Sequence, residues 1–415
     1  MRPGIFDIEN WREIGATLAR NKTRTFLTAF GIFWGTTMLA LLWGGSNGFE
    51  GIMRRNLSGI ATNLGVLFSG QRTISYKGFN KGTSWSMTNE DIDAIRQVAP
   101  AIEYSSAICS RYVYGAYESK TTAGSVIGVE DDYSKIMTVN LIEGRFLNAS
   151  DMADGRKVVA IGKNRAAELF GDESPVGKYV KIYGIYFQCV GVVAQLGEAS
   201  IGNRIEDSFI VPMRTFQNTI NHSNNIGFLV YTAPQGSSPM DNEEAIRRVL
   251  CLRHYIHPDD ENAISFWDVT EQFRSIDVVF IGISILALFV GLGSLLAGVI
   301  GVGNIMWIVV KERTHEFGIR RAIGAKPSDI TIQVLSESIL LTLIAGSVGV
   351  SFATIILGIL DQATLDPLLG KAGFSLPFSV AIGIVVTFFI LGTIAGTLPA
   401  MKAMSIKPIE AIRDK

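Results

Sequence analysis

The sequence predicts an α+β membrane protein with four transmembrane helices and a large extracytoplasmic α/β domain between the first and the second helix. The first observation is composition: of 415 residues, 48% are hydrophobic and 18% are charged, which is rich in apolar residues for a soluble protein. The second is that charged residues are absent from four stretches, residues 25–49, 278–310, 338–360 and 372–401. Each meets or exceeds the roughly 20 apolar residues that a helix needs to cross a bilayer. The third is the mixed strand and helix pattern of residues 48–277.

The apolar stretches define the transmembrane helices, because a helix satisfies its own backbone hydrogen bonds in lipid. We assign these helices to residues 25–47, 278–310, 330–360 and 376–400. At about 1.5 Å per residue the second of them reaches roughly 50 Å, so it either tilts strongly or extends into water. A short extracytoplasmic loop, residues 361–375, joins the last two helices, and residues 401–415 form a tail.

Lysine and arginine predict the orientation, because cytoplasmic segments carry an excess of both near the membrane. They concentrate before the first span, between the second and third spans, and after the fourth: Arg2, Arg12, Arg20, Lys22, Arg24, Lys311, Arg313, Arg320, Arg321, Lys326, Lys402, Lys407, Arg413 and Lys415. The loop 361–375 has only Lys371, beside Asp361 and Asp366. Both chain ends and residues 311–329 are therefore expected on the cytoplasmic side of the membrane. Residues 48–277 are expected on the outside.

Residues 1–24 are expected to form an amphipathic helix on the inner membrane surface. Charged residues lie away from one helical face, and that face collects Ile8, Trp11, Ile14, Gly15 and Leu18. A helix with this pattern beside a transmembrane segment lies in the plane of the interface.

The external segment, residues 48–277, is expected to hold an α/β part that is interrupted by a second, mostly β part. Short apolar runs predict strands at residues 66–68, 102–108, 112–117, 125–129, 158–161, 179–182, 187–193, 209–211, 227–231 and 263–267. Helices are expected at residues 164–169 and 242–252 and after Thr88, where Thr88-Asn-Glu-Asp91 has the form of a capping box. Both ends of the domain, residues 49–60 and 269–277, are expected to continue as stalk helices into the membrane.

The chain shows no convincing motif for catalysis or cofactor binding. Residues 171–178 superficially resemble a phosphate-binding loop. Such a loop has four residues between its glycines and a Ser or Thr after its lysine, whereas this segment has five residues and Tyr179 at those places. We expect a turn before a strand there. His254 and His257 have the spacing of a metal pair but lack a convincing third ligand, so a surface pair is favoured. We therefore expect a non-catalytic subunit with no cofactor and no metal of its own.

Net charge and cysteine content limit the remaining possibilities. A net charge of −1 gives no support for nucleic-acid binding. Cys109, Cys189 and Cys251 all fall in the external segment, where at most one disulfide could form. Three small core residues are the favoured interpretation.

The predicted spans contain one carboxylate, Glu337, and several glycines, and each allows two interpretations. Glu337 is either a functional buried carboxylate or a group that stays hydrated near the cytoplasmic interface. Glycines recur at positions suited to close helix packing, namely Gly291, Gly293, Gly298, Gly301, Gly303, Gly346, Gly349, Gly392 and Gly396. Packing within the chain and dimerisation explain these glycines equally well.

Residues 311–329 form a short charged link between two apolar spans, and they are the most informative part of the sequence. A helix is expected to about Ile323, with Gly324 as a left-handed cap and Pro327 barring its continuation. Apolar and charged side chains alternate along it, which favours a helix that docks on a soluble partner over a plain solvated loop. The candidate contact residues are Glu316, Phe317, Gly318, Ile319, Arg320, Arg321, Ala322, Ile323, Gly324 and Ala325.

The link also carries a family resemblance. Residues 312–325, Glu-Arg-Thr-His-Glu-Phe-Gly-Ile-Arg-Arg-Ala-Ile-Gly-Ala, closely resemble the signature of ABC transporter permeases of the macrolide-exporter (MacB) and FtsX type. The resemblance covers nearly the whole chain. It extends to residues 21–35, to Val129, residues 144–146, Asp151, residues 158–162, 169–171 and 175–178, Gly191, Val192 and Pro212, and to Pro399, Ala400, Ala403 and residues 408–413.

The resemblance implies a homodimer of four-helix subunits, each docked through residues 316–325 on a cytoplasmic ABC ATPase that binds ATP and Mg²⁺. A heterodimer remains an alternative to the homodimer. The resemblance also implies a protein of the inner (cytoplasmic) membrane, whose external domain lies in the periplasm and has a porter-like part and an inserted β-rich part. In such complexes mechanotransmission through the second span drives substrates outward from the periplasm, often through an adaptor and an outer-membrane channel. The chain lacks the nucleotide-binding domain of the fused exporters, so a separate ATPase is expected.

Three functions remain after this reading of the sequence. The first is a permease subunit that exports peptides, antibiotics or toxins by efflux. The second is a lipoprotein-releasing permease, which residues 47–50, Asn-Gly-Phe-Glu, faintly suggest. The third is a non-transporting protein that controls an envelope hydrolase.

Overall fold

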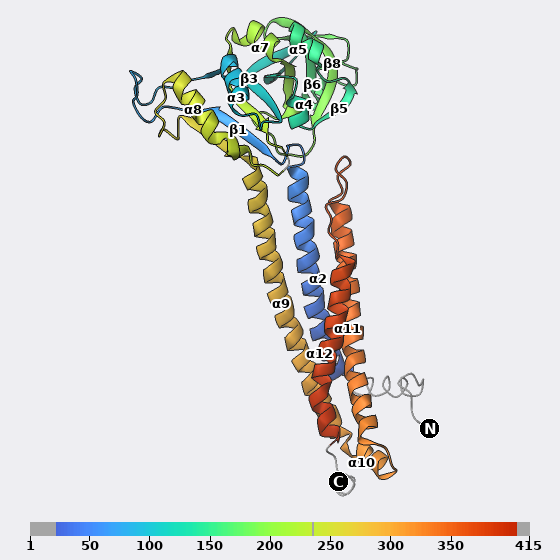
Figure 1. The fold of residues 1–415 in the computed structure, drawn as a ribbon. Helices are drawn as coiled ribbons and strands as arrows, with labels where there is room; N and C mark the ends of the chain where they lie inside the picture. The colour runs from blue at the N-terminus through green and yellow to red at the C-terminus, as the bar shows by residue number, and fades with distance from the viewer. Residues whose placement is uncertain (1–21, 235, 405–415) are drawn as a thin grey trace. The chain divides into compact units, whose positions relative to one another are not determined.

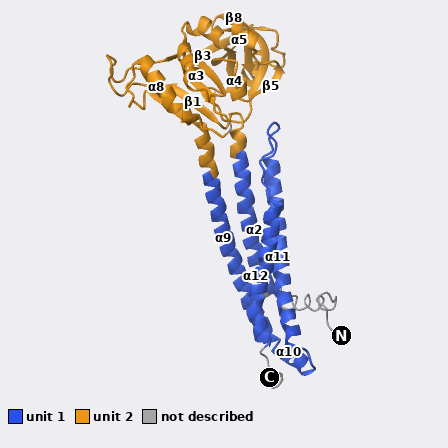
Figure 2. Ribbon diagram, in the orientation of Figure 1, with its two compact units in different colours: residues 1–52, 278–415 blue, residues 53–277 orange. Residues whose placement is uncertain are grey.

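The computed structural model describes residues 22–234 and 236–404. The predicted amphipathic helix and the last residues of the predicted tail therefore lie outside the described residues, apart from residues 22–24 and 401–404. The described chain divides into two compact units (Figure 2). One contains the residues up to Ile52 together with those from Val278 onward, and the other is Met53–Asp277.

The first unit contains the four long apolar helices that the sequence predicts, which confirms the predicted fold class (Figure 1). They are α2 (Lys22–Asn56), α9 (Val269–Glu312), α11 (Pro327–Ala363) and α12 (Phe378–Met404). The chain passes between the two units twice, and both passages are helical, since α2 continues to Asn56 and α9 starts at Val269. The stalk helices are therefore confirmed, although the first ends at Asn56 and not at Ile60.

Glycines let these helices approach closely. A Cβ atom added to Gly349 of α11 would lie 2.2 Å from Thr36 Oγ1 of α2, and one added to Gly392 of α12 would lie 2.3 Å from Thr342 Oγ1 of α11. At the second crossing, Ser338 Oγ also donates a hydrogen bond to the Gly392 carbonyl at 2.7 Å. Packing within the chain thus explains these two glycines, as it explains Gly291, Gly298, Gly303, Gly346 and Gly396. Gly293 and Gly301 would meet no atom within 4 Å.

The loop between α11 and α12 packs on α2. Asp361 accepts hydrogen bonds from the amides of Gly373 and Phe374 at 2.8 and 3.0 Å, which folds the loop back on itself. The Phe374 ring meets the Phe49 ring edge-on, with centroids 5.6 Å apart. Gly51 of α2 leaves room for the backbone of the loop, because a Cβ there would overlap a carbonyl oxygen.

The second unit is built on one ten-stranded mixed sheet (Figure 1). Its strands are β1 (Leu64–Ser69), β3 (Tyr104–Tyr117), β4 (Lys120–Val129), β5 (Val139–Gly144), β6 (Val158–Gly162), β7 (Tyr179–Ile182), β8 (Ile185–Gln195), β9 (Ser208–Pro212), β11 (Phe228–Thr232) and β12 (Ile264–Asp268). A separate two-stranded sheet pairs β2 (Met87–Thr88) with β10 (Asn225–Ile226). The helices are α3 (Asn89–Val98), α4 (Tyr133–Ile136), α5 (Ala149–Asp154), α6 (Lys163–Phe170), α7 (Met213–Phe216) and α8 (Glu243–His254), with short turns η1 (Ile205–Asp207), η2 (Gln217–Asn221) and η3 (Pro239–Asn242). The two strands predicted at residues 102–108 and 112–117 are one long strand, β3.

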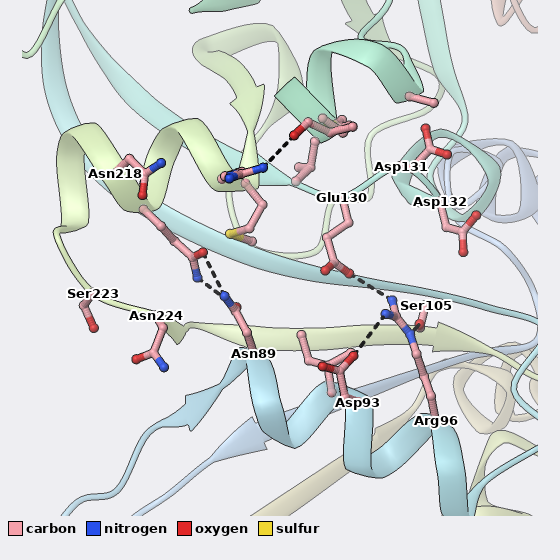
Figure 3. A pocket seen from close by; sticks show the side chains of 18 of the residues that line it. Asn89, Asp93, Arg96, Ser105, Glu130, Asp131, Asp132, Asn218, Ser223 and Asn224 are labelled. Carbon is pink, nitrogen blue, oxygen red and sulfur yellow. Dashed lines mark hydrogen bonds and ion pairs between the residues drawn. The ribbon is translucent and has the colours of Figure 1, made fainter. Parts of the chain in front are cut away.

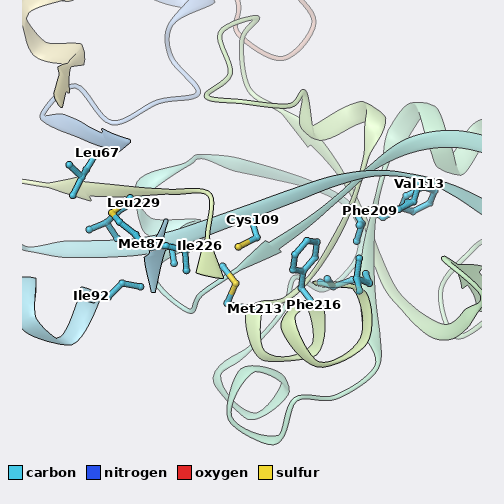
Figure 4. Packing of buried hydrophobic residues seen from close by; sticks show 14 of the residues in the cluster. Leu67, Met87, Ile92, Cys109, Val113, Phe209, Met213, Phe216, Ile226 and Leu229 are labelled. Carbon is cyan, nitrogen blue, oxygen red and sulfur yellow. The ribbon is translucent and has the colours of Figure 1, made fainter. Parts of the chain in front are cut away.

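Six strands of the second unit close into a barrel. The pairings run from β3 to β4, β9, β6, β8 and β7 and return to β3. Alternate residues point inward, as small closed barrels require, and they join the main hydrophobic cluster, of which Figure 4 shows a part. Gly115 and Gly124 face the large Phe209 ring, which a Cβ at either position would approach within 3.1 Å. The first half of β3 instead pairs with β11 and so continues into β1 and β12.

The capping box predicted for α3 is present and anchors a larger polar cluster. Asp91 is fully buried and accepts hydrogen bonds from the Thr88 amide at 2.9 Å and from Arg253 Nε at 2.5 Å. His254 Nε2 lies 2.7 Å from the same carboxylate, and its ring packs on Trp85. The expectation of a surface histidine pair is therefore wrong for His254, which is held in the cluster.

The cysteines follow the favoured interpretation. Cys109, Cys189 and Cys251 are buried and free. Burial raises the pKa of the Cys109 thiol to about 11 and that of the Cys189 thiol to about 12. Both thiols therefore stay protonated and pack as small apolar groups.

The first testable prediction concerns Asp91. Burial alone would raise the pKa of this carboxyl, but hydrogen bonds from His254 and Arg253 outweigh it and lower the pKa to about 2. Since a depressed pKa stabilises the fold above the ordinary pKa of about 4, Asp91→Asn should cost about 2 kcal/mol at neutral pH. The difference from wild type should shrink as the pH falls from about 4 to 2.

Urea unfolding of the full chain in detergent, followed by tryptophan fluorescence, measures this difference. The exposed Asp93→Asn on the same helix is the matched control and should unfold like wild type. Equal stability of Asp91→Asn and wild type at neutral pH would contradict the assignment.

Candidate functional site

The link between α9 and α11 folds into the short helix α10 (Thr314–Ala322). The backbone leaves α9 at Arg313 and leaves α10 at Ile323, and Gly324 then adopts a left-handed conformation with φ of +108°. Pro327 occupies the first turn of α11, where its missing N–H costs no hydrogen bond. The predicted helix and its glycine end are therefore confirmed.

One face of α10 is packed into the helix bundle. Phe317 is 1% exposed and belongs to the cluster that contains Val310, Ile330 and Val334. Gly318 is buried beside it. The expectation that Phe317 is a contact residue for a partner is wrong, because its ring fills the space between α10 and its neighbouring helices.

An ionic network around the buried Glu337 joins α10 to both helices that flank it. Arg313 lies 3.0 Å from Glu337 of α11 through Nη1 and 2.9 Å from Glu316 of α10 through Nη2. Its guanidinium also lies over the Phe317 ring, 5.1 Å from the centroid. Glu337 is 2% exposed. Of the two interpretations left open for Glu337, hydration at the interface is therefore wrong.

The charge of Arg313 is stabilised by its partners. Burial disfavours the charged guanidinium, but the hydrogen bond to Glu316 and the charge of Glu337 outweigh burial and raise the pKa of Arg313. A charged side chain at this depth needs such partners, because an unpaired buried charge costs several kcal/mol.

Two more arginines tie α10 to the bundle. Arg320 donates a hydrogen bond to Gln333 Oε1 of α11 at 3.0 Å and lies 2.9 Å from Glu316. Arg321 donates to the carbonyl of Met404 at the end of α12, at 3.1 Å. Through Arg313, Arg320 and Arg321, α10 is therefore attached to α11 and α12 as well as to the end of α9.

The opposite face of α10 is exposed and apolar. Ile323 is 82% exposed and Ile319 is 40% exposed. His315 and Ala322 are exposed as well, and with Ile319 and Ile323 they follow the i, i+4, i+7 and i+8 spacing of one helical face. We call these four residues the outer face of α10. Of the ten candidate contact residues, the structure thus exposes Ile319, Ala322, Ile323 and Gly324, and it engages Glu316, Phe317, Gly318, Arg320 and Arg321 within the bundle. The tenth, Ala325, is half-buried, and its amide donates a hydrogen bond to the Arg320 carbonyl at 3.0 Å.

The remaining sequence candidates have structural roles in the second unit. Residues 171–178 connect α6 to β7, and Gly171 and Gly177 have positive φ, which confirms a turn before a strand. Among the described residues there is no group of three or more His, Cys, Asp or Glu side chains that could hold a metal ion. Arg54 Nη2 lies 2.5 Å from Asp277 Oδ1, so an ion pair that the sequence did not reveal links the two stalk helices.

Comparison with known proteins identifies two regions of the chain. Residues 25–249, more than half of the chain, match the model of the MacB-like periplasmic core domain. Residues 288–408 match the model of the FtsX-like permease C-terminal region. The second match includes α10 and its partners on α11 and α12.

The relatives agree with these matches. The chain is 28% identical over 411 residues to the macrolide export ATP-binding/permease protein MacB of Bdellovibrio bacteriovorus, which covers 98% of this chain and 62% of the relative. It is 28% identical over 408 residues to the ABC transporter permease YknZ of Bacillus subtilis, covering 98% of this chain and 99% of the relative. The chain thus spans about three-fifths of the length of that MacB protein and nearly all of YknZ.

A crystal structure of the periplasmic region of MacB from Actinobacillus actinomycetemcomitans matches with a TM-score of 0.43 and 18% identity, covering 54% of this chain and 96% of that chain. The family-model matches and the four apolar helices carry the assignment. This chain, a multi-pass membrane protein, belongs to the MacB/FtsX type of ABC transporter permeases.

Proposed function

We propose that the chain is the permease subunit of an ABC export complex, in which the outer face of α10 docks on a separate cytoplasmic ATPase. ATP and Mg²⁺ bind to that partner, and this chain takes no direct part in catalysis. The movement of the ATPase reaches the periplasmic domain and drives peptides, antibiotics or toxins across the envelope. The single observation that carries the proposal is the exposure of Ile319 and Ile323 on a helix whose opposite face is packed against the bundle.

The side-chain contacts that hold α10 on the bundle make this helix suitable for transmitting force. A helix held only by its chain ends would rotate or slide when a partner pushes on it. Arg313, Arg320 and Arg321 instead connect α10 to α11 and α12, and Phe317 fills the space beneath it. A push on Ile319 or Ile323 therefore displaces several helices together, because close-packed interiors resist deformation.

The route from the bundle to the periplasmic domain is helical. α9 runs without a break from Val269 in the second unit to Glu312 beside α10. A helix of this length extends to roughly 65 Å, and a continuous helix carries displacement that a flexible linker would dissipate. α2 provides the second helical passage.

Orientation follows from the lysines and arginines of the link and of both chain ends, as described above. We place α10 and the two termini in the cytoplasm and residues 53–277 in the periplasm, with the protein in the inner membrane. A homodimer or a heterodimer, a periplasmic adaptor and an outer-membrane channel complete the proposed complex. The MacB relative is named as an ATP-binding/permease protein, which supports an ATPase partner for this permease region.

The second testable prediction concerns the outer face of α10. Changing both Ile319→Asp and Ile323→Asp should abolish co-purification of the ATPase, because two charges replace the exposed apolar contact. Helix packing should be unchanged, since neither side chain is buried. Pull-down from detergent extracts and ATP turnover of the reconstituted complex measure the effect.

The matched control is Leu252→Asp, an equally drastic change at a residue of α8 that is 69% exposed. This variant should retain the ATPase and its turnover. Wild-type ATPase binding by the double variant would remove the main support for the docking role.

The third testable prediction concerns the buried network. Arg313→Met removes the guanidinium that lies 3.0 Å from the buried Glu337 carboxylate, so it should destabilise the chain by about 3–5 kcal/mol. Adding Glu337→Leu should recover most of that loss, because the buried carboxylate is gone and Glu316 keeps Arg320 as a partner. Thermal unfolding in detergent, compared for the two single variants and the double variant, measures the coupling between the residues.

A recovered double variant that binds the ATPase but no longer stimulates its turnover would show that the network transmits force as well as stabilising the fold. Additive losses in the single and double variants would be inconsistent with a direct pairing of Arg313 and Glu337.

A further inference from the structure

The periplasmic unit contains a cleft of about 1160 Å³ that is separate from α10 (Figure 3). One wall is α3, which lies beside the open part of the sheet, and the other wall is formed by α5, α7 and η2 near the barrel. Its floor includes Ser105 and Val129 at the ends of β3 and β4. The volume exceeds the roughly 300–1,000 Å³ of pockets for drug-sized molecules, so a ligand of several residues can enter.

Side-chain amides line both walls of this cleft. Asn89 of α3 and Gln217 of η2 face each other and exchange two hydrogen bonds, of 3.0 and 2.9 Å, across its width. Asn218 and Asn224 also line the cleft. The Asn224 side-chain amide donates a hydrogen bond to the Glu90 carboxylate at 3.1 Å. An amide side chain offers both a donor and an acceptor, which suits it to the peptide groups of a polypeptide backbone.

The charges in the cleft favour a cationic ligand. Four carboxylates line it, those of Asp93, Glu130, Asp131 and Asp132, against the two guanidiniums of Arg96 and Arg214. Both guanidiniums are engaged, and so are three of the carboxylates, since Asp93 lies 3.9 Å from Arg96 and Asp132 lies 2.9 Å from Lys135. The four carboxylates still outnumber the two guanidiniums of the lining. Arg96 binds Glu130 at 3.2 Å and Ser105 at 3.1 Å, and Arg214 donates to the Ala153 carbonyl at 2.7 Å. Asp93 and Asp131 are exposed.

Methionines provide the apolar part of the lining. Met152 of α5 is half-buried and Met213 of α7 is buried, and both line the cleft with Ile92 of α3. Methionine side chains adapt to ligands of different shape. Amides for a backbone, carboxylates for basic side chains and adaptable apolar contacts together describe a site for a short amphipathic polypeptide with basic residues.

We infer that this cleft binds a short cationic peptide segment, with Asp93 and Asp131 pairing with its basic side chains and the amides on both walls contacting its backbone. The inference rests on the proposed export function, because it names the class of peptide that the complex would take up from the periplasm. Since the two walls belong to different parts of the unit, a bound peptide would contact both at once.

The test uses the full chain in neutral phosphatidylcholine nanodiscs, without any ATPase, and a fluorescein-labelled peptide amide, Lys-Leu-Lys-Leu-Lys-Leu. Fluorescence anisotropy should show saturable binding to wild type. Asp93→Asn combined with Asp131→Asn should weaken the affinity at least tenfold, and both positions are exposed, so the fold is preserved. The acidic counterpart, Glu-Leu-Glu-Leu-Glu-Leu amide, should not bind to wild type.

The matched control removes two exposed carboxylates of the same unit outside the cleft, by Asp172→Asn combined with Glu261→Gln. This variant should bind the basic peptide like wild type. Equal loss in the control, or wild-type affinity in the cleft variant, overturns the inference. Because the assay contains no ATPase, peptide binding can fail while α10 still recruits its partner, and it can succeed when that recruitment fails.

Discussion

The ion pair of Arg313 and Glu337 is the interaction on which the arrangement of the helix bundle depends. It places a guanidinium from the end of α9 against a carboxylate that is 2% exposed on α11. Neither charge is tolerable alone at this depth. The pair therefore sets the position of α10 between α9 and α11, and Glu316 and Phe317 complete the surroundings of the same guanidinium. The exposed direction of Ile319 and Ile323 follows from that position, since the opposite face of the helix is already occupied.

Helical continuity is the second constraint, and it comes from the membrane. A backbone in lipid satisfies its hydrogen bonds only as a helix or a closed barrel, so the spans must be helical, but nothing requires the helices to continue beyond the bilayer. Here they do continue, because α2 reaches Asn56 and α9 begins at Val269. The ion pair of Arg54 and Asp277 links the two helices where they enter the second unit. An exposed pair of this kind contributes little stability, so the helical continuity of the two passages does not depend on it.

Much of this structure could be predicted from local pattern. The four spans, the capping box at Thr88, the turn at residues 171–178 and the end of α10 at Gly324 each depend on neighbouring residues alone. The failures depend on partners distant in the chain. Phe317 and Ile319 look alike in sequence, and only the packing of α11 and α12 buries the first and exposes the second. Likewise, Glu337 is 24 residues from Arg313, and the closure of the barrel needs β7 to meet β3.

The long strand β3 explains why the second unit can hold a cleft between two parts and still be one sheet. Its first half pairs with β11, and its second half pairs with β7 in the barrel. The floor residues Ser105 and Val129 lie at one end of β3 and of its partner β4. A strand that belongs to both parts keeps the floor fixed, since shifting its register by one residue would turn its core residues outward. The walls, by contrast, meet the floor through helices and turns, and across the cleft Asn89 and Gln217 are joined by only two neutral hydrogen bonds. A ligand that took the place of the Asn89–Gln217 contact would therefore replace weak interactions, because each neutral hydrogen bond contributes only about 1 kcal/mol.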